Sequence, residues 1–214
     1  MKKRNVFACG CIAFLFLFVQ CETNSSKKDL EKKPVVKNVI FMIGDGMGVS
    51  QVYAGLTANK NKLNLERSQA IGFSKTYSAN DYITDSAAGG TALACGQKTT
   101  NGTIGMDTLG NPIKSMLHCA AENGLSTGIV VSCNLTHATP ASFIAHQPNR
   151  NMSKEIAADY MNVPFTVAIG GGRKYFEKRE DDRNLTDELK AKEYQVAYTL
   201  DEMKNVSSGK LIAL

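Results

Sequence analysis

The sequence predicts an α/β fold with a largely parallel central sheet and helices on both faces. Short apolar runs rich in Val and Ile, such as Gly-Ile-Val-Val at 128–131, are typical of strands buried in a parallel sheet. Stretches of helical pattern alternate with these runs, as in successive βαβ units. The 214 residues, 43% of them hydrophobic and 21% charged, are enough for one domain with a sizeable core.

The first expected strand is the apolar, β-branched run Val35–Val36 and Asn38–Ile43, which a glycine turn at 44–48 ends. A short helix follows at 50–57, with Ser50 as a candidate cap. The further expected elements are a strand at 71–77, a helix of small residues at 86–94 packed closely on the sheet, a helix at 113–123 that stops at Gly124, a buried strand at 126–132, a helix at 153–161, a third buried strand at 165–169, and short helices at 186–192 and 200–205.

The N-terminus predicts export. Residues 1–20 combine a basic start with an apolar run from Val6 to Val19, and we interpret them as a signal peptide. Cys21 ends that run before a polar, lysine-rich stretch, which resembles a bacterial lipoprotein signal with residues 21–34 as a tether. An ordinary cleaved signal and a retained anchor are the alternatives. We expect a protein of the periplasm or cell envelope, held at the membrane only by a lipid on Cys21.

Charge and cysteine counts limit the partners and the chemistry. The formal net charge is +5, but residues 1–20 carry three basic and no acidic residues, so 22 basic and 20 acidic residues remain. That balance gives no reason to expect nucleic acid as a partner. The body holds Cys95, Cys119 and Cys133 without a CxxC pair. We expect three small buried side chains that form at most one disulfide.

Two segments carry side chains suited to phosphoryl chemistry. Asp45 follows the first expected strand, at the edge where open α/β sheets bind ligands; an ordinary Asp-Gly turn is the alternative. Ser86 stands at an expected helix start, where backbone N–H groups and the helix dipole favour a phosphate. An ordinary helix N-cap is the alternative for Ser86, but Asp85 can act as the cap and leave the Ser86 hydroxyl free. A serine without a nearby histidine base can lose its proton with the help of a metal.

Two later segments add a histidine, a threonine and an arginine. His137 and Thr139 follow the expected strand at 126–132, so parallel strands would bring them to the same sheet edge. A solvated histidine and a Thr-Pro helix start are the alternatives. The guanidinium of Arg150 can bind two phosphate oxygens, although any single arginine can also be an ordinary surface charge.

The order of these motifs resembles the alkaline phosphatase family from about Val35 to the last residue. The segments that carry the resemblance are Asp-Gly-Met-Gly at 45–48, Thr-Asp-Ser-Ala-Ala-Gly-Gly-Thr-Ala at 84–92, Lys-Thr-Thr-Asn-Gly-Thr-Ile-Gly at 98–105, His-Ala-Thr-Pro at 137–140, Asn-Arg at 149–150 and Ala-Ile-Gly-Gly-Gly-Arg-Lys-Tyr at 168–175. The resemblance implies hydrolysis of small phosphate monoesters through a phosphoserine intermediate, with zinc and magnesium as cofactors and inorganic phosphate as product.

The same resemblance implies a role for each motif residue. Ser86 would be the catalytic nucleophile, with its oxygen on a zinc ion, and Asp45 would bridge that zinc and the magnesium. Thr139 would ligate magnesium, and His137 would order a magnesium-bound water. Arg150 would be both catalytic and substrate-binding, because it would hold the phosphoryl oxygens. A homodimer is compatible with the family.

The sequence departs from the family in its later zinc ligands. The family takes most of them from a later half of the chain, whereas this sequence ends at Leu214 within an apolar run, and it looks like an N-terminal half. His118 and His146 are expected to be structural. We therefore expect an incomplete sheet and a chain that is unstable and nearly inactive alone.

Two other functions compete with phosphomonoester hydrolysis. A phosphodiesterase or phosphonate hydrolase of the same superfamily is disfavoured, because an arginine that binds two free phosphate oxygens suits a monoester dianion. A non-catalytic envelope lipoprotein that binds phosphate or a partner is the alternative from a different class.

Overall fold

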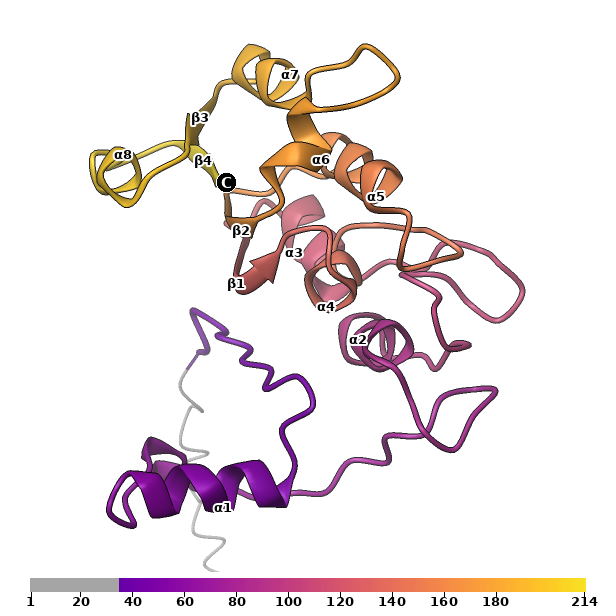
Figure 1. Ribbon diagram of the computed structural model, residues 1–214, viewed down its shortest axis with the longest axis vertical. Helices are drawn as coiled ribbons and strands as arrows, with labels where there is room; N and C mark the ends of the chain where they lie inside the picture. The colour runs from indigo at the N-terminus through magenta and orange to yellow at the C-terminus, as the bar shows by residue number, and fades with distance from the viewer. Residues whose placement is uncertain (1–34) are drawn as a thin grey trace, which may run out of the picture. The chain divides into compact units, whose positions relative to one another are not determined.

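The computed structural model describes residues 35–214 (Figure 1). The signal peptide expected at 1–20 and the tether at 21–34, with Cys21, lie outside the described residues. Contacts divide the chain into a first unit that ends at Met42 and a second unit, Ile43–Leu214. Residues 35–42 of the first unit contain no helix or strand. Within the part of the chain that is described, no helix is long and apolar enough to cross a membrane.

The second unit contains a four-stranded parallel sheet, which confirms the predicted fold class. Its strands are β1 (Gly128–Asn134), β2 (Val167–Gly171), β3 (Tyr194–Ala197) and β4 (Lys210–Ala213), in the spatial order β1-β2-β4-β3. All three neighbouring pairs are parallel, with Ala168 of β2 opposite both Ile129 of β1 and Ile212 of β4. Parallel strands require crossover connections, and helices supply them here.

Within residues 35–214, three helices precede β1 along the chain, and the other five lie between successive strands. The helices are α1 (Val49–Ala58), α2 (Ser86–Cys95), α3 (Met116–Glu122), α4 (Ala138–Ala141), α5 (Ser153–Asp159), α6 (Arg173–Glu177), α7 (Leu185–Ala191) and α8 (Leu200–Lys204), with short 3-10 turns at Asn64–Arg67 and Tyr160–Asn162.

Both faces of the sheet are covered, but unequally. On one face, the strand residues Ile129, Ala168 and Ile212 join a large core with residues of α3, α5, α6 and α7. On the other face, Leu211 and Ala213 form a small cluster with α8 and the loop that follows it. In Figure 1, α8 accordingly lies on the opposite side of β3 and β4 from α5 and α6. The pleat explains the division, because successive side chains of a strand point to opposite faces.

Two segments predicted to be strands are not strands. The run 38–43 forms no strand, and most of its apolar side chains are exposed, Val39 by 80% and Ile40 by 87%. Residues 71–77 also form no strand, and Ile71 and Phe73 are exposed. Both segments have the composition of strands, but a strand exists only where a neighbouring strand accepts and donates its backbone hydrogen bonds. The sequence pattern shows the strand-like composition, but it does not show whether a neighbouring strand is available.

Two further packing predictions are corrected. The strand expected to be buried at 126–132 is β1, which lies at an edge of the sheet and alternates, with Ile129 buried and Val130 70% exposed. The small-residue helix, α2, packs against α4 rather than on the sheet. A Cβ on Gly90 would lie 2.8 Å from Ser142 Oγ, so the small residue is what lets the two helices approach.

Other elements differ from the prediction in their caps or first residues, or were not predicted. The cap of α1 is Gly48, whose N–H donates to Gln51 Oε1, and not Ser50. Helix α3 begins only after Ser115, whose side chain caps it, but it ends beside Gly124 as expected. The strands β3 and β4 and the helix α6 were not predicted, since four or five residues are too few to show a clear period.

Candidate active site

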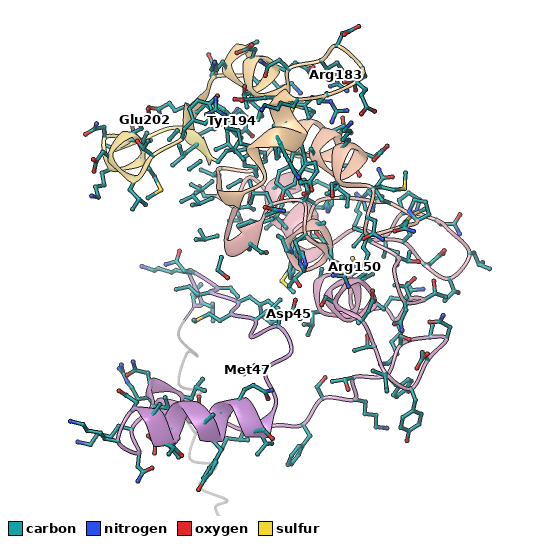
Figure 2. All side chains as sticks on the ribbon, viewed as in Figure 1. Asp45, Met47, Arg150, Arg183, Tyr194 and Glu202 are labelled. Atoms are coloured by element: carbon teal, nitrogen blue, oxygen red, sulfur yellow. The ribbon has the colours of Figure 1, made fainter. Side chains whose placement is uncertain are left out.

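Asp45 lies on the turn that follows residues 38–43. The Met47 amide donates to the Gly44 carbonyl at 3.2 Å, and Gly46 has a φ of +66°. That φ is in the left-handed region, which glycine adopts without the steric cost that other residues meet. The turn leaves the Asp45 carboxylate exposed and directed at two other segments (Figure 2).

Ser86 is the first residue of α2, and its neighbour Asp85 is the N-cap. Asp85 Oδ1 accepts from the Ala88 amide at 2.9 Å, so the aspartate satisfies the orphan donor of the first turn. The Ser86 hydroxyl is thereby left free of capping, as predicted, and donates to Asp45 Oδ1 at 3.0 Å.

Thr139 and His137 lie at the start of α4, immediately after β1. His137 is the N-cap residue of α4, and its amide donates to the Asn134 carbonyl at the end of β1. Thr139 Oγ1 donates to Asp45 Oδ2 at 2.8 Å. The His137 side chain is exposed. The carboxyl end of β1 therefore places Thr139 in the site, at the sheet edge where parallel folds bind ligands.

The two oxygens of Asp45 thus accept from two hydroxyls that are 41 and 94 residues away in the chain, Ser86 on Oδ1 and Thr139 on Oδ2. Close packing of α2 against α4 brings the helix starts that carry these two hydroxyls close together. The structure therefore brings together Asp45, Ser86 and Thr139, which the sequence named from separate segments.

Arg150 reaches the same site through Asp85. Its Nη1 donates to Asp85 Oδ2 at 3.0 Å, and the two side chains are 25% and 26% exposed. Partial burial alone raises the pKa of the Asp85 carboxyl, but hydrogen bonds from the Ala88 and Gly102 amides and from Arg150 outweigh it, so the pKa lies below its ordinary value. Because Asp85 precedes Ser86, the ion pair fixes a guanidinium beside the serine.

Sequence reasoning assigned no role to the loop at 98–105, and it treated Asp85 only as a cap. Asn101 Oδ1 accepts from the Asp85 amide at 3.0 Å, and the Gly102 amide donates to Asp85 Oδ2 at 3.1 Å. The Asn-Gly pair is a turn signal, but nothing in its spacing indicates which segment it contacts.

The other two histidines lie outside this group. The rings of His118 and His146 stack at 5.2 Å between centroids. His118 Nδ1 lies 2.8 Å from Ser115 Oγ, and His146 Nδ1 lies 2.6 Å from the Gly105 carbonyl. The stack therefore joins α3 to the segment that carries His146, and the His146 ring joins that segment to Gly105, consistent with the structural role that the sequence predicted.

The three body cysteines are free, and the prediction that all three are buried is wrong, because Cys119 is exposed and Cys95 and Cys133 are half-buried. Cys95 donates to the Ile113 carbonyl at 3.6 Å, and burial, with a smaller contribution from Cys119, raises its pKa to about 11. A thiol with a raised pKa is a poor nucleophile at neutral pH.

The oxygen donors of the site suit magnesium better than zinc. Asp45, Ser86 and Thr139 offer one carboxylate and two hydroxyls, and Mg²⁺ binds through a few such oxygens while it keeps several waters. Zinc favours His and Cys with carboxylates. No group of three or more His, Cys, Asp and Glu residues within 35–214 could hold a metal ion. These residues therefore fit a magnesium ion and do not by themselves complete a zinc site.

Sequence comparison places this site in a known family. The profile of the family described as alkaline phosphatase matches residues 36–213. Alkaline phosphatase 4 of Bacillus subtilis is 40% identical over 210 residues, which cover 91% of this chain and 45% of that protein. The repressible alkaline phosphatase of Saccharomyces cerevisiae is 35% identical, over 86% of this chain and 37% of that protein.

Solved structures agree with the sequence comparison. The alkaline phosphatase of the Antarctic bacterium TAB5 matches with a TM-score of 0.76 and 37% identity, over 79% of this chain and 51% of that one. A histidine-to-glutamate variant of that enzyme, with Mg bound in its M3 site, matches with a TM-score of 0.75. The chain belongs to the alkaline phosphatase family. It spans about half the length of the curated relatives that it matches.

Proposed function

We propose that this chain supplies the serine half of a phosphomonoesterase site, in which Ser86 takes the phosphoryl group from a small monoester and releases it to water as inorganic phosphate. The observation that carries the proposal is the Asp45 carboxylate, which accepts from Ser86 and Thr139 while Asp85 holds Arg150 beside the serine.

The residues present have distinct parts in that reaction. Ser86 Oγ, which donates to Asp45 Oδ1 at 3.0 Å, forms a bond to phosphorus as the bond from phosphorus to the leaving oxygen breaks. The serine proton passes to solvent, and the leaving oxygen takes up a proton from solvent. Arg150 uses one nitrogen on Asp85 and presents the rest of its guanidinium to the phosphoryl oxygens. Backbone N–H groups at the start of α2 favour the same negative charge.

Magnesium would be held by Asp45 and Thr139, with His137 toward its water shell. A bound divalent cation supplies positive charge that lowers the pKa of a nearby hydroxyl. Zinc on Asp45 and Ser86 stays part of the proposal, although residues 35–214 do not by themselves complete a zinc site. We likewise propose that the protein is exported, carries a lipid on Cys21 and forms a homodimer.

Trapping of phosphoserine tests the proposed function. The purified chain, supplied with Mg²⁺, Zn²⁺ and a labelled monoester and quenched at low pH, should carry label on Ser86. A single turnover suffices, so slow overall hydrolysis does not hide the result. Ser86→Ala should remove the label, whereas Ser132→Ala, which alters an exposed serine of β1, should keep it.

An unlabelled chain would contradict the proposal. Phosphate binding without label would instead support the second candidate, a non-catalytic envelope lipoprotein. The absence of a group of metal-binding His, Cys, Asp and Glu residues within 35–214 favours that candidate.

A further inference from the structure

The segment that leads into the serine is not held by apolar packing. Tyr82 and Ile83 are 94% and 79% exposed, and residues 82–85 belong to no helix or strand. Yet this segment sets the direction in which Asp85 and Ser86 enter α2. Hydrogen bonds must therefore fix it.

The side chain of Asn101 makes two of those bonds. Its Oδ1 accepts from the Asp85 amide at 3.0 Å, and its Nδ2 donates to the Ile83 carbonyl at 2.9 Å. An asparagine amide has one acceptor and a donor group, as a peptide unit has. Asn101 thus pairs with the extended segment as a neighbouring strand would, where no strand exists.

The next residue extends the same contact to the arginine. The Gly102 amide donates to Asp85 Oδ2 at 3.1 Å, and its carbonyl accepts from the Arg150 amide at 2.7 Å. The turn is itself fixed, because the Asn101 amide donates to Asn80 Oδ1 at 2.8 Å. One two-residue turn therefore contacts the backbone before the serine, the carboxylate of Asp85 and the backbone of Arg150.

We propose that Asn101 is a positioning residue of the site, which holds the Ile83–Asp85 backbone so that Asp85 can orient Arg150 toward phosphate. Asn101 is not assigned contact with the phosphate. The expected effect of Asn101 on phosphate binding rests on the proposed function, whereas its effect on the position of the Ile83–Asp85 backbone does not. Removal of its amide should loosen the segment and weaken phosphate binding through Arg150.

The test compares Asn101→Ala with Asn111→Ala in the full chain. Asn111 is the matched control, because its amide also closes a loop, onto Asp107, but on a turn that makes no contact with Asp85 or Arg150. Hydrogen exchange of the Asp85 amide should be about tenfold faster in Asn101→Ala, the factor that the loss of one hydrogen bond produces. Asn111→Ala should match the unaltered chain.

A double-mutant cycle then separates positioning from general destabilisation. Asn101→Ala should raise the Kd for inorganic phosphate, measured with Mg²⁺ and Zn²⁺ present, by about tenfold. In an Arg150→Ala background it should have no further effect. Unchanged exchange in Asn101→Ala, or an equal loss of affinity with and without Arg150, would overturn the proposal. If the unaltered chain binds no phosphate, the proposed function fails, and the exchange rates alone decide whether Asn101 holds Asp85.

Discussion

At the scale of single residues, Asp85 has the densest set of contacts in the site. Its two oxygens accept from the Ala88 and Gly102 amides and from Arg150, so the same carboxylate caps α2 and anchors the guanidinium. A residue with this many charge-assisted bonds contributes to stability as well as to the geometry of the site.

Replacement of Asp85 by asparagine should destabilise the chain. The amide oxygen can still cap α2, but the amide nitrogen would face the donors of Gly102 and Arg150, and a partly buried donor without an acceptor costs about 1–3 kcal/mol. Urea unfolding at neutral pH measures the loss. Asp187→Asn removes an exposed carboxylate of α7 that pairs with Lys190, and it should change stability by no more than about 0.5 kcal/mol. Equal stability of Asp85→Asn and the unaltered chain would show that the amide satisfies all three donors.

At the scale of secondary-structure elements, the contact between α2 and α4 decides whether Ser86 and Thr139 can share Asp45. Gly89 and Gly90 are adjacent in α2 but differ in surroundings: a Cβ on Gly89 would meet only the Thr84 side chain at 3.5 Å, whereas one on Gly90 would lie 2.8 Å from Ser142 Oγ.

Alanine should lower the stability of the chain at Gly90 but not at Gly89. Gly90→Ala should destabilise by about 1–3 kcal/mol, because α2 must move away from α4. Gly89→Ala should be neutral or stabilising by up to about 1 kcal/mol, since alanine favours a helix more than glycine does. Thermal unfolding of both variants measures the difference. A stabilised Gly90→Ala would mean that Ser142 can rotate away at little cost.

Because His118 is half-buried and stacks on His146, we expect the stability of the folded chain to depend on pH. Burial, followed by the neighbouring His146, lowers the pKa of His118 below its usual 6.5, against smaller opposite effects of Glu122 and Asp159. The unfolded chain therefore binds the proton more readily, and stability falls as pH drops from about 6.5 through the lower folded pKa.

Urea unfolding between pH 7.5 and pH 5 measures this effect. His118→Asn should flatten the decline. An unaltered slope in His118→Asn would assign the acid sensitivity to other groups.

At the scale of the whole molecule, the chain exposes apolar side chains in segments that have the composition of strands. Val39, Ile40, Ile71 and Phe73 are all exposed. Exposed apolar side chains favour association and the binding of hydrophobic probes. The isolated 214-residue chain should therefore bind a hydrophobic fluorescent dye strongly, and a Val39→Thr, Ile40→Thr double variant should bind it less. Dye fluorescence at matched concentrations is the measurement, and equal fluorescence would place the dye elsewhere.

The sequence by itself predicted the residues of the candidate site. Asp45, Ser86, Thr139 and Arg150 were each singled out by residue type and position with an ordinary alternative left open, and the resemblance to the alkaline phosphatase family implied their roles. The parallel α/β class was also determined, because alternating strand and helix patterns are properties of neighbouring residues. Only the tertiary structure decided which strand-like runs became strands, since that depends on hydrogen-bond partners far away in the chain. It also decided that Asp85 holds Arg150 and that Asn101 holds Asp85, because these contacts span 65 and 16 residues and no local pattern encodes them.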